Sequence, residues 1–236
     1  MDESLTFLVS IFPRLLAAVP LTLALTAISG VIGNALAVPV ALARLSPNPL
    51  LWMPSAFYIL LMRGTPLLVQ TYLIYYGLGE ILPGSFIQQT FLWEYLKDGF
   101  WYAVFAFSLN TAGYTGEILR GAMSAVPRGE IEAAKAYGMS SRQILWRVTL
   151  PRAIQICLPA MSGETILLLK ATSLASLITV WDVMGTARQI QKESYRIYEP
   201  LIAAGIIYIV TVFILTRLLN WLERRINQHR AAPQSA

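Results

Sequence analysis

The sequence predicts an all-α integral membrane protein with five transmembrane helices, its N-terminus outside and its C-terminus inside. Hydrophobic residues make up 56% of the chain and charged residues only 13%, whereas charged residues make up about 25% of a soluble domain. The charges are also clustered, and none lies between Arg14 and Arg44. A stretch of that length crosses the roughly 30 Å hydrocarbon core of a bilayer with some tilt.

Five apolar stretches are predicted as spans of a single transmembrane domain over 1–236. They lie at about 17–42, 64–82, 99–120, 154–181 and 200–220. In the first span, Gly30 and Gly33 form a small-residue face that suits close helix packing. Trp101 and Tyr102 open the third span, because aromatic side chains favour the membrane–water interface.

The second span allows two interpretations. One is a single broken helix over 54–79, and the other is an interfacial segment over 50–62 followed by a span that begins near Thr65. Thr65 suits an N-cap and Pro66 suits the first helical position. We favour a break at Arg63, because a charge is costly at the middle of a bilayer.

The charges of the loops orient the spans, because basic residues concentrate on the inner side of a membrane. The loop from Arg120 to Arg152 holds six basic and two acidic residues, and the tail after the fifth span is also basic. The loop over 79–98 is net negative. We therefore expect 79–98 and a polar loop over 182–199 outside. The net charge of +5 reflects this orientation rather than nucleic-acid binding.

The longest polar run among the apolar stretches is 132–151, and it predicts a helix–turn–helix outside the bilayer. The first helix covers 130–137, which contains good helix formers and no breaker. Gly138 follows where a left-handed residue ends a helix, since glycine has no Cβ to clash. Ser140 and Gln143 then have the spacing of a capping box, which predicts the start of the second helix.

The spacing within this run matches a known motif. It reads Glu132-Ala133-Ala134, three residues, Gly138, nine residues, Val148, one residue, Leu150-Pro151. The pattern resembles the cytoplasmic loop of permease subunits of ATP-binding-cassette importers, in which isoleucine takes the place of Val148. The resemblance implies that 127–151 is a coupling loop whose motif residues dock on an ATPase subunit. From composition alone, an amphipathic helix pair at the lipid headgroups is the alternative.

Two further motifs extend the resemblance over nearly the whole chain. They are Arg63-Gly64-Thr65-Pro66 and Leu109-Asn110-Thr111-Ala112-Gly113-Tyr114. The overall pattern is similar to the histidine, arginine, ornithine and opine permeases. It implies a multi-pass permease of the bacterial inner membrane that imports an amino acid or opine by alternating access. The implied partners are a dimeric ATP-binding subunit that holds ATP and Mg²⁺, a sister permease or second copy of this chain, and a periplasmic solute-binding protein.

Polar side chains at membrane depth are candidates for the solute site. Asn110, Tyr114 and Glu117 share one face of the third span. Glu164 lies inside the fourth span, and Lys170 points about 120° away from it on an ideal helix, so Glu164 needs another partner. By resemblance to the family, the cavity residues are Asn110, Tyr114, Glu117, Glu164, Thr172 and Ser173. Glu164 would be counter-ion to a guanidinium or ammonium group; structural hydrogen bonds are the alternative for Glu164, Asn110 and Tyr114.

Several other classes of chemistry are disfavoured. Cys157 is the only cysteine and His229 the only histidine, so a disulfide within the chain is impossible and no metal site is expected. No G-x-x-x-x-G-K-[ST] phosphate loop occurs, so we expect no cofactor and no ATP hydrolysis in this chain. An integral-membrane enzyme would need a reactive cluster near the interface, and none is evident. A secondary transporter would make the coupling motif a coincidence, and the small number of spans also argues against it.

Overall fold

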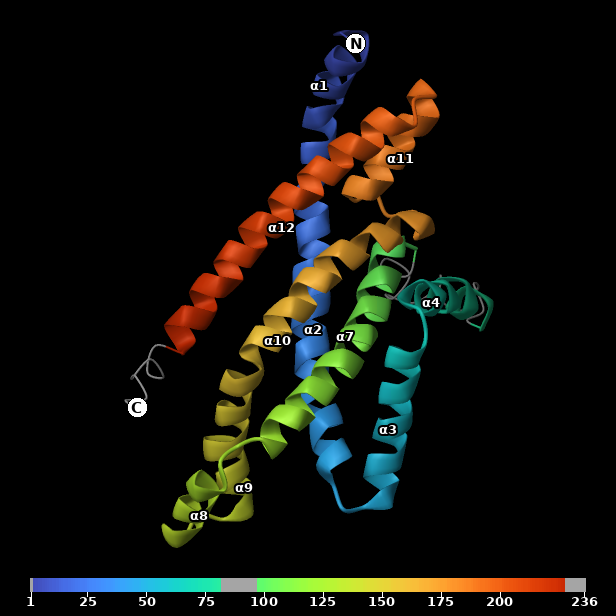
Figure 1. Ribbon diagram of the computed structural model, residues 1–236. Helices are drawn as coiled ribbons and strands as arrows, with labels where there is room; N and C mark the ends of the chain where they lie inside the picture. The colour runs from blue at the N-terminus through green and yellow to red at the C-terminus, as the bar shows by residue number, and fades with distance from the viewer. Residues whose placement is uncertain (1, 82–96, 228–236) are drawn as a thin grey trace.

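The computed structural model describes residues 2–81 and 97–227, and every regular element in these ranges is a helix (Figure 1). The helices are α1 (Asp2–Leu16), α2 (Val19–Leu45), α3 (Pro49–Gly64), α4 (Leu67–Ile81), α7 (Gly99–Ser124), α8 (Arg128–Ala136), α9 (Ser141–Ile144), α10 (Leu150–Ala171), α11 (Val183–Ser194) and α12 (Tyr198–Ile226). A π-helical turn at Leu145–Thr149 joins α9 to α10, and a 3-10 helix at Thr172–Ile178 follows α10.

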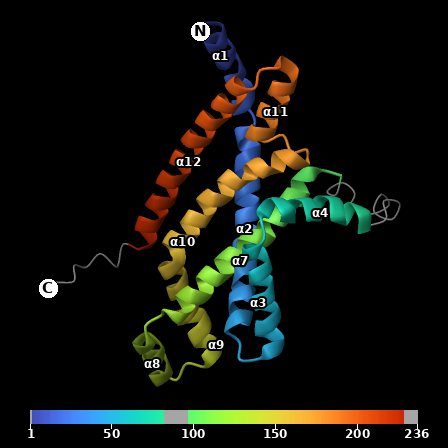
Figure 2. The ribbon, with the colours of Figure 1, turned by 45° about the vertical axis from the view of Figure 1, so that its right-hand side comes forward.

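Helix α7 lies at the centre of the molecule and packs along α2, with α3, α4 and α10 around it (Figure 2). The α2–α7 contact is close because Gly33 has no side chain. A Cβ at Gly33 would lie 2.6 Å from Thr111 Cβ. A Cβ at Gly30 would instead make an ordinary contact, 3.6 Å from Leu168 Cδ2 of α10. The predicted small-residue face of α2 is thus confirmed at Gly33.

The predicted break near Arg63 is confirmed. Helix α3 and the 67–78 part of α4 meet at an angle of 107°, and Thr65 and Pro66 lie between them. Helix α3 runs beside α2, whereas α4 turns sharply away from it (Figure 1). The outer loop predicted at 79–98 lies mostly outside the described residues, as does the tail after Asn227.

Length and composition qualify three helical segments of the described chain as membrane spans. They are α2, the continuous segment Ser141–Ile178, and α12, and the bent pair α3–α4 is a fourth when counted as one span. Helix α7 is not among them. In the region of the predicted fourth span, 154–181, helix α10 begins at Leu150 and is followed by a 3-10 helix after Ala171.

The polar stretch predicted as an outer loop over 182–199 is mostly helix α11. The side chains of Val183, Ala187 and Ile190 pack on α1 and α12 in a common apolar cluster. Val183, Ala187 and Ile190 recur at helical spacing, a signal that the polar composition of this stretch hides. Asp182 caps this helix by accepting from Gly185 N at 2.8 Å.

Helix α1, which was not predicted, docks on α11 and α12 through Ile11 and Leu15. Arg14 forms a two-pronged ion pair with Glu193 of α11, and one of its nitrogens lies 2.9 Å from Glu193 Oε1. The hydrogen bonds from Arg14 lower the pKa of Glu193 below its usual range. Arg196 binds Glu3 at 2.7 Å on the same side. The apolar spacing of α1 could have predicted it.

Candidate functional site

The polar run at 127–151 forms the predicted helix–turn–helix, α8 and α9. Gly138 has a φ of +76° and ends the first helix in the left-handed conformation. Ser140 starts the second with a complete capping box. Its N–H donates to Gln143 Oε1 at 2.8 Å, and Gln143 N–H donates back to Ser140 Oγ at 3.4 Å. The local geometry predicted from these residues is therefore confirmed.

Helices α8 and α9 project from the end of the molecule opposite to α1 and α11 (Figures 1 and 2). Ala134 and Leu150 of the motif face inward and are buried. The exposed residues of the motif are Glu132, Ala133, Gly138 and Pro151, and Val148 is half-buried. Beside them, Tyr137 is 89% exposed.

The helix pair is anchored to the rest of the chain. Arg152 Nε of α10 lies 3.0 Å from Glu130 Oε1 of α8. The nitrogen is not aligned for a hydrogen bond, so the contact is an ion pair. Leu150 joins an apolar cluster with Leu119 and Met123 of α7. Ile131 of α8 packs against the same cluster, so α8 is held against residues of both α7 and α10.

A cavity of about 270 Å³ lies between α7, α10 and the break after α3. Three of the predicted site residues, Asn110, Tyr114 and Glu164, line it together. The rest of its wall is formed by Thr65, Pro66, Leu67, Thr111, Leu167, Leu168 and Ala171. The break between α3 and α4 thus lines the same cavity as Glu164. The sequence did not indicate that these two segments lie together.

Both N–H bonds of the Asn110 amide are used to hold the break. Asn110 Nδ2 donates to Met62 O at 3.1 Å and to Gln70 Oε1 at 2.9 Å. Gln70 Nε2 in turn donates to Met62 O at 2.9 Å and to Thr65 Oγ1 at 2.8 Å. Gln70 is buried, and its role in closing the break was not predicted. Asn110 can offer the cavity an acceptor oxygen but no free N–H.

Glu164 has no hydrogen-bonded or ion-paired partner in the described part of the chain, and Arg63 acts on it only electrostatically. No hydrogen bond or ion pair to its carboxylate is found there, and the side chain is half-buried at the cavity wall. Lys170 lies elsewhere on α10, where it borders a hollow against Tyr208 and Phe213 of α12. The expectation that Lys170 does not neutralise Glu164 agrees with this placement.

The remaining predicted residues lie apart from this cavity. Glu117 borders a neighbouring one and accepts two hydrogen bonds from Arg120, at 2.9 and 2.6 Å, on a single oxygen. Thr172 is fully buried and donates to Leu169 O at 2.7 Å, and Ser173 donates to Lys170 O at 2.8 Å. The tightening of the helix after Ala171 carries both hydroxyls back onto their own backbone.

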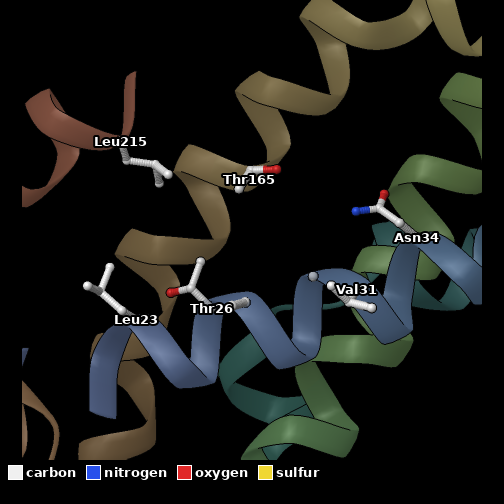
Figure 3. A pocket seen from close by; sticks show the side chains of 8 residues that line it. Leu23, Thr26, Val31, Asn34, Thr165 and Leu215 are labelled. Carbon is white, nitrogen blue, oxygen red and sulfur yellow. The ribbon is translucent and has the colours of Figure 1, made fainter. Parts of the chain in front are cut away.

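A larger hollow of about 550 Å³ opens between α2, α10 and α12 (Figure 3). Its labelled walls include Leu23, Val31 and Leu215, and its polar groups are limited to Thr26, Asn34 and Thr165. None of the described residues that line it is charged, so its surface resembles that of lipid-facing helices more than a site for a charged solute.

Comparison with known proteins places the chain in a family. Residues 33–228 match the model of the binding-protein-dependent transport system inner membrane component. The chain belongs to this family. The permease is 44% identical to the octopine transport system permease protein OccM of Rhizobium radiobacter over 233 residues, which covers 96% of this chain and 94% of that one. It is 39% identical to the histidine/lysine/arginine/ornithine permease protein HisM of Escherichia coli K12, covering 89% and 88%.

Solved structures agree with this assignment. The permease matches an amino acid ABC transporter at 33% identity with a TM-score of 0.78, covering 92% of this chain and 96% of that chain. The inward-facing MetNI methionine transporter matches with a TM-score of 0.75 at 19% identity, covering 92% and 98%. The second match shows the common fold alone.

Proposed function

We propose that this permease works in an ATP-driven importer of cationic amino acids or opines. The observation that carries the proposal is the anchored α8–α9 pair, which presents Glu132, Gly138 and Tyr137 at one end of the molecule. An exposed helix pair tied to the helices of the cavity by Ile131 and by the ion pair of Glu130 with Arg152 is what a coupling element requires. Relatives named for octopine, nopaline and histidine/lysine/arginine/ornithine transport support the solute class.

We further propose five spans, with α7 as the third. Helix α7 has 26 residues, about 39 Å at 1.5 Å per residue, which exceeds the roughly 30 Å core of a bilayer. Its lower hydropathy follows from its central position, since neighbouring helices cover it. The basic end with α8 and α9 then faces the cytoplasm, and α1 and α11 face outside.

The cavity suits a solute with a positive group. Glu164 supplies an unpaired carboxylate, and Asn110 supplies an acceptor because its N–H groups are engaged. A guanidinium or ammonium group has donors and no acceptor, so it matches such a lining. The cation of the solute then stabilises the charged form of Glu164. After the solute leaves, the side chain remains half-buried at the cavity wall.

The partners follow from this arrangement. A dimeric ATP-binding subunit docks on α8 and α9, a periplasmic binding protein delivers the solute outside, and a sister permease or a second copy completes the pathway. ATP closes the ATPase dimer and moves the helix pair. Because α8 and α9 are tied to α7 and α10, their movement shifts both walls of the cavity and turns it from inward- to outward-facing.

Uptake in cells tests the proposal. Cells with the chain should accumulate labelled arginine, ornithine or octopine, and cells without it should not. Glu164→Gln should lower that uptake at least about tenfold, since a charge-assisted pair is lost, whereas Glu164→Asp should retain part of it. Normal uptake of a cationic solute by Glu164→Gln would refute the counter-ion role. Selective uptake of glutamate would refute the solute class.

A further inference from the structure

A second cavity lies beside the one that contains Glu164. It has a volume of about 440 Å³ and lies between α2, α3 and α7, with Arg44, Arg63 and Glu117 among its walls. Tyr114 borders both cavities. The guanidinium carbon of Arg63 lies 5.4 Å from the centroid of the Tyr114 ring, so this cation–π contact stands where the two spaces meet.

The second cavity has an excess of positive charge. Glu117 is the only carboxylate among the described residues that line it, and Arg120 already occupies one of its oxygens. Arg44 and Arg63 also act on Glu117 electrostatically but form no ion pair with any described residue. Two guanidinium groups of the lining, those of Arg44 and Arg63, thus have no ion-paired carboxylate among the described residues, although Arg63 also acts electrostatically on Glu164 of the first cavity. Arginine binds a carboxylate through two parallel hydrogen bonds, so an anionic group of this shape is the matching ligand.

The cavity lies toward the cytoplasmic end in the proposed orientation. Arg44 is in the last turn of α2, and the turn from α2 to α3 lies at the same end as α8 and α9 (Figure 1). A solute that leaves the Glu164 cavity through the contact of Arg63 with Tyr114 therefore enters this second space.

On the basis of the proposed import function, we propose that this second cavity is a release site, where Arg44 and Arg63 bind the carboxylate of the solute. The two cavities then bind opposite ends of an amino acid. Glu164 binds its cationic group, and the two arginines bind its carboxylate. Arg63 trades its contact with Tyr114 for the carboxylate, and the movement of the ring opens the way between the cavities.

The test compares L-arginine with agmatine, which has the same guanidinium but no carboxylate. Their binding is measured on the intact complex in nanodiscs, without nucleotide or binding protein, after ATP-dependent arginine uptake by the wild type is established. Arg44→Gln should weaken arginine binding about tenfold, as expected for losing a charged hydrogen-bonded pair, and leave agmatine binding unchanged. Arg44→Lys should retain part of the arginine affinity. Glu164→Gln should weaken both ligands.

Two results would overturn the release site. One is an equal effect of Arg44→Gln on both ligands, or no effect on either. The other concerns lipid, because a headgroup phosphate also suits two arginines. If phosphatidylglycerol in the nanodisc lowers arginine binding to the wild type and not to Arg44→Gln, the cavity is a lipid site. If the wild-type complex shows no ATP-dependent uptake at all, the import function itself is refuted.

Discussion

Asn110 Nδ2 donates to Gln70 Oε1 at 2.9 Å, and both amides also donate to the carbonyl oxygen of Met62. Two side chains from α7 and α4 thus satisfy the backbone that the break leaves without helical partners. In a membrane an unsatisfied carbonyl costs several kcal/mol, so a broken helix needs such groups. This clamp fixes the edge of the cavity at Thr65 and Pro66.

The clamp predicts a loss of stability in Gln70→Ala. Removing a buried amide leaves the Met62 carbonyl and the Asn110 amide short of partners, which costs about 1–3 kcal/mol. Thermal unfolding of the purified complex measures it. Gln70→Glu is the matched control, because it keeps the acceptor for Asn110 and loses the donors. Combining Gln70→Ala with Asn110→Ala should cost less than the sum of the two; strict additivity would argue against a shared clamp.

The close α2–α7 contact predicts opposite outcomes for two neighbouring glycines. Gly33→Ala places a methyl group 2.6 Å from Thr111 Cβ, which should cost about 1–3 kcal/mol by overpacking and lower uptake. Gly30→Ala has room, 3.6 Å from Leu168 Cδ2. It should be neutral or slightly stabilising, because alanine favours helix more than glycine. The melting temperatures of the two variants measure this difference in stability. Equal melting temperatures would contradict the described packing.

The turn at Gly138 predicts a difference between asparagine and aspartate. Both tolerate the left-handed conformation better than most residues, and a Cβ at Gly138 has open space around it. Gly138→Asn should therefore keep the ATPase bound. Gly138→Asp places a charge in the proposed contact and should reduce co-purification of the ATPase. If Gly138→Asp retains as much ATPase as Gly138→Asn, Gly138 is not at the docking surface.

Helix α1 predicts a contrast between two adjacent leucines. Leu15 is fully buried, whereas Leu16 is 53% exposed. Leu15→Ala should destabilise the protein by about 2–5 kcal/mol, and Leu16→Ala should have little effect. Limited proteolysis of α1 in the purified complex measures its docking. Equal protection of the two variants would show that α1 does not depend on this contact.

The docking of α1 should also weaken in acid. Arg14 lowers the pKa of Glu193, so the ion pair stabilises the folded state above the ordinary glutamate pKa. That contribution is lost as the pH falls through the lowered value. Proteolysis of α1 should therefore rise at acid pH in the wild type and change less in Glu193→Gln. The same increase in both would assign the effect to other groups.

Local signals in the sequence account for much of the fold. The left-handed Gly138, the capping box at Ser140 and the break near Arg63 each depend on a few neighbouring residues, and the structure has all three. The clamp could not be predicted, because Gln70 and Asn110 lie 40 residues apart and meet only after α4 folds against α7. Resemblance to the family predicts Thr172 at the cavity, whereas the structure buries it in the 3-10 helix after α10. The 3-10 helix that buries it packs against α11, and also against α7 and α4, which are far from it in the sequence.

The most direct test of the account is ATP-driven transport in proteoliposomes that contain this permease, its ATPase and its binding protein. In vesicles whose permease has α8 and α9 toward the lumen, with the binding protein outside, labelled arginine or octopine should accumulate inside only when ATP is enclosed in the lumen. Glu164→Gln should abolish most of that accumulation. Accumulation driven by an ion gradient without ATP would contradict the account and favour a secondary transporter.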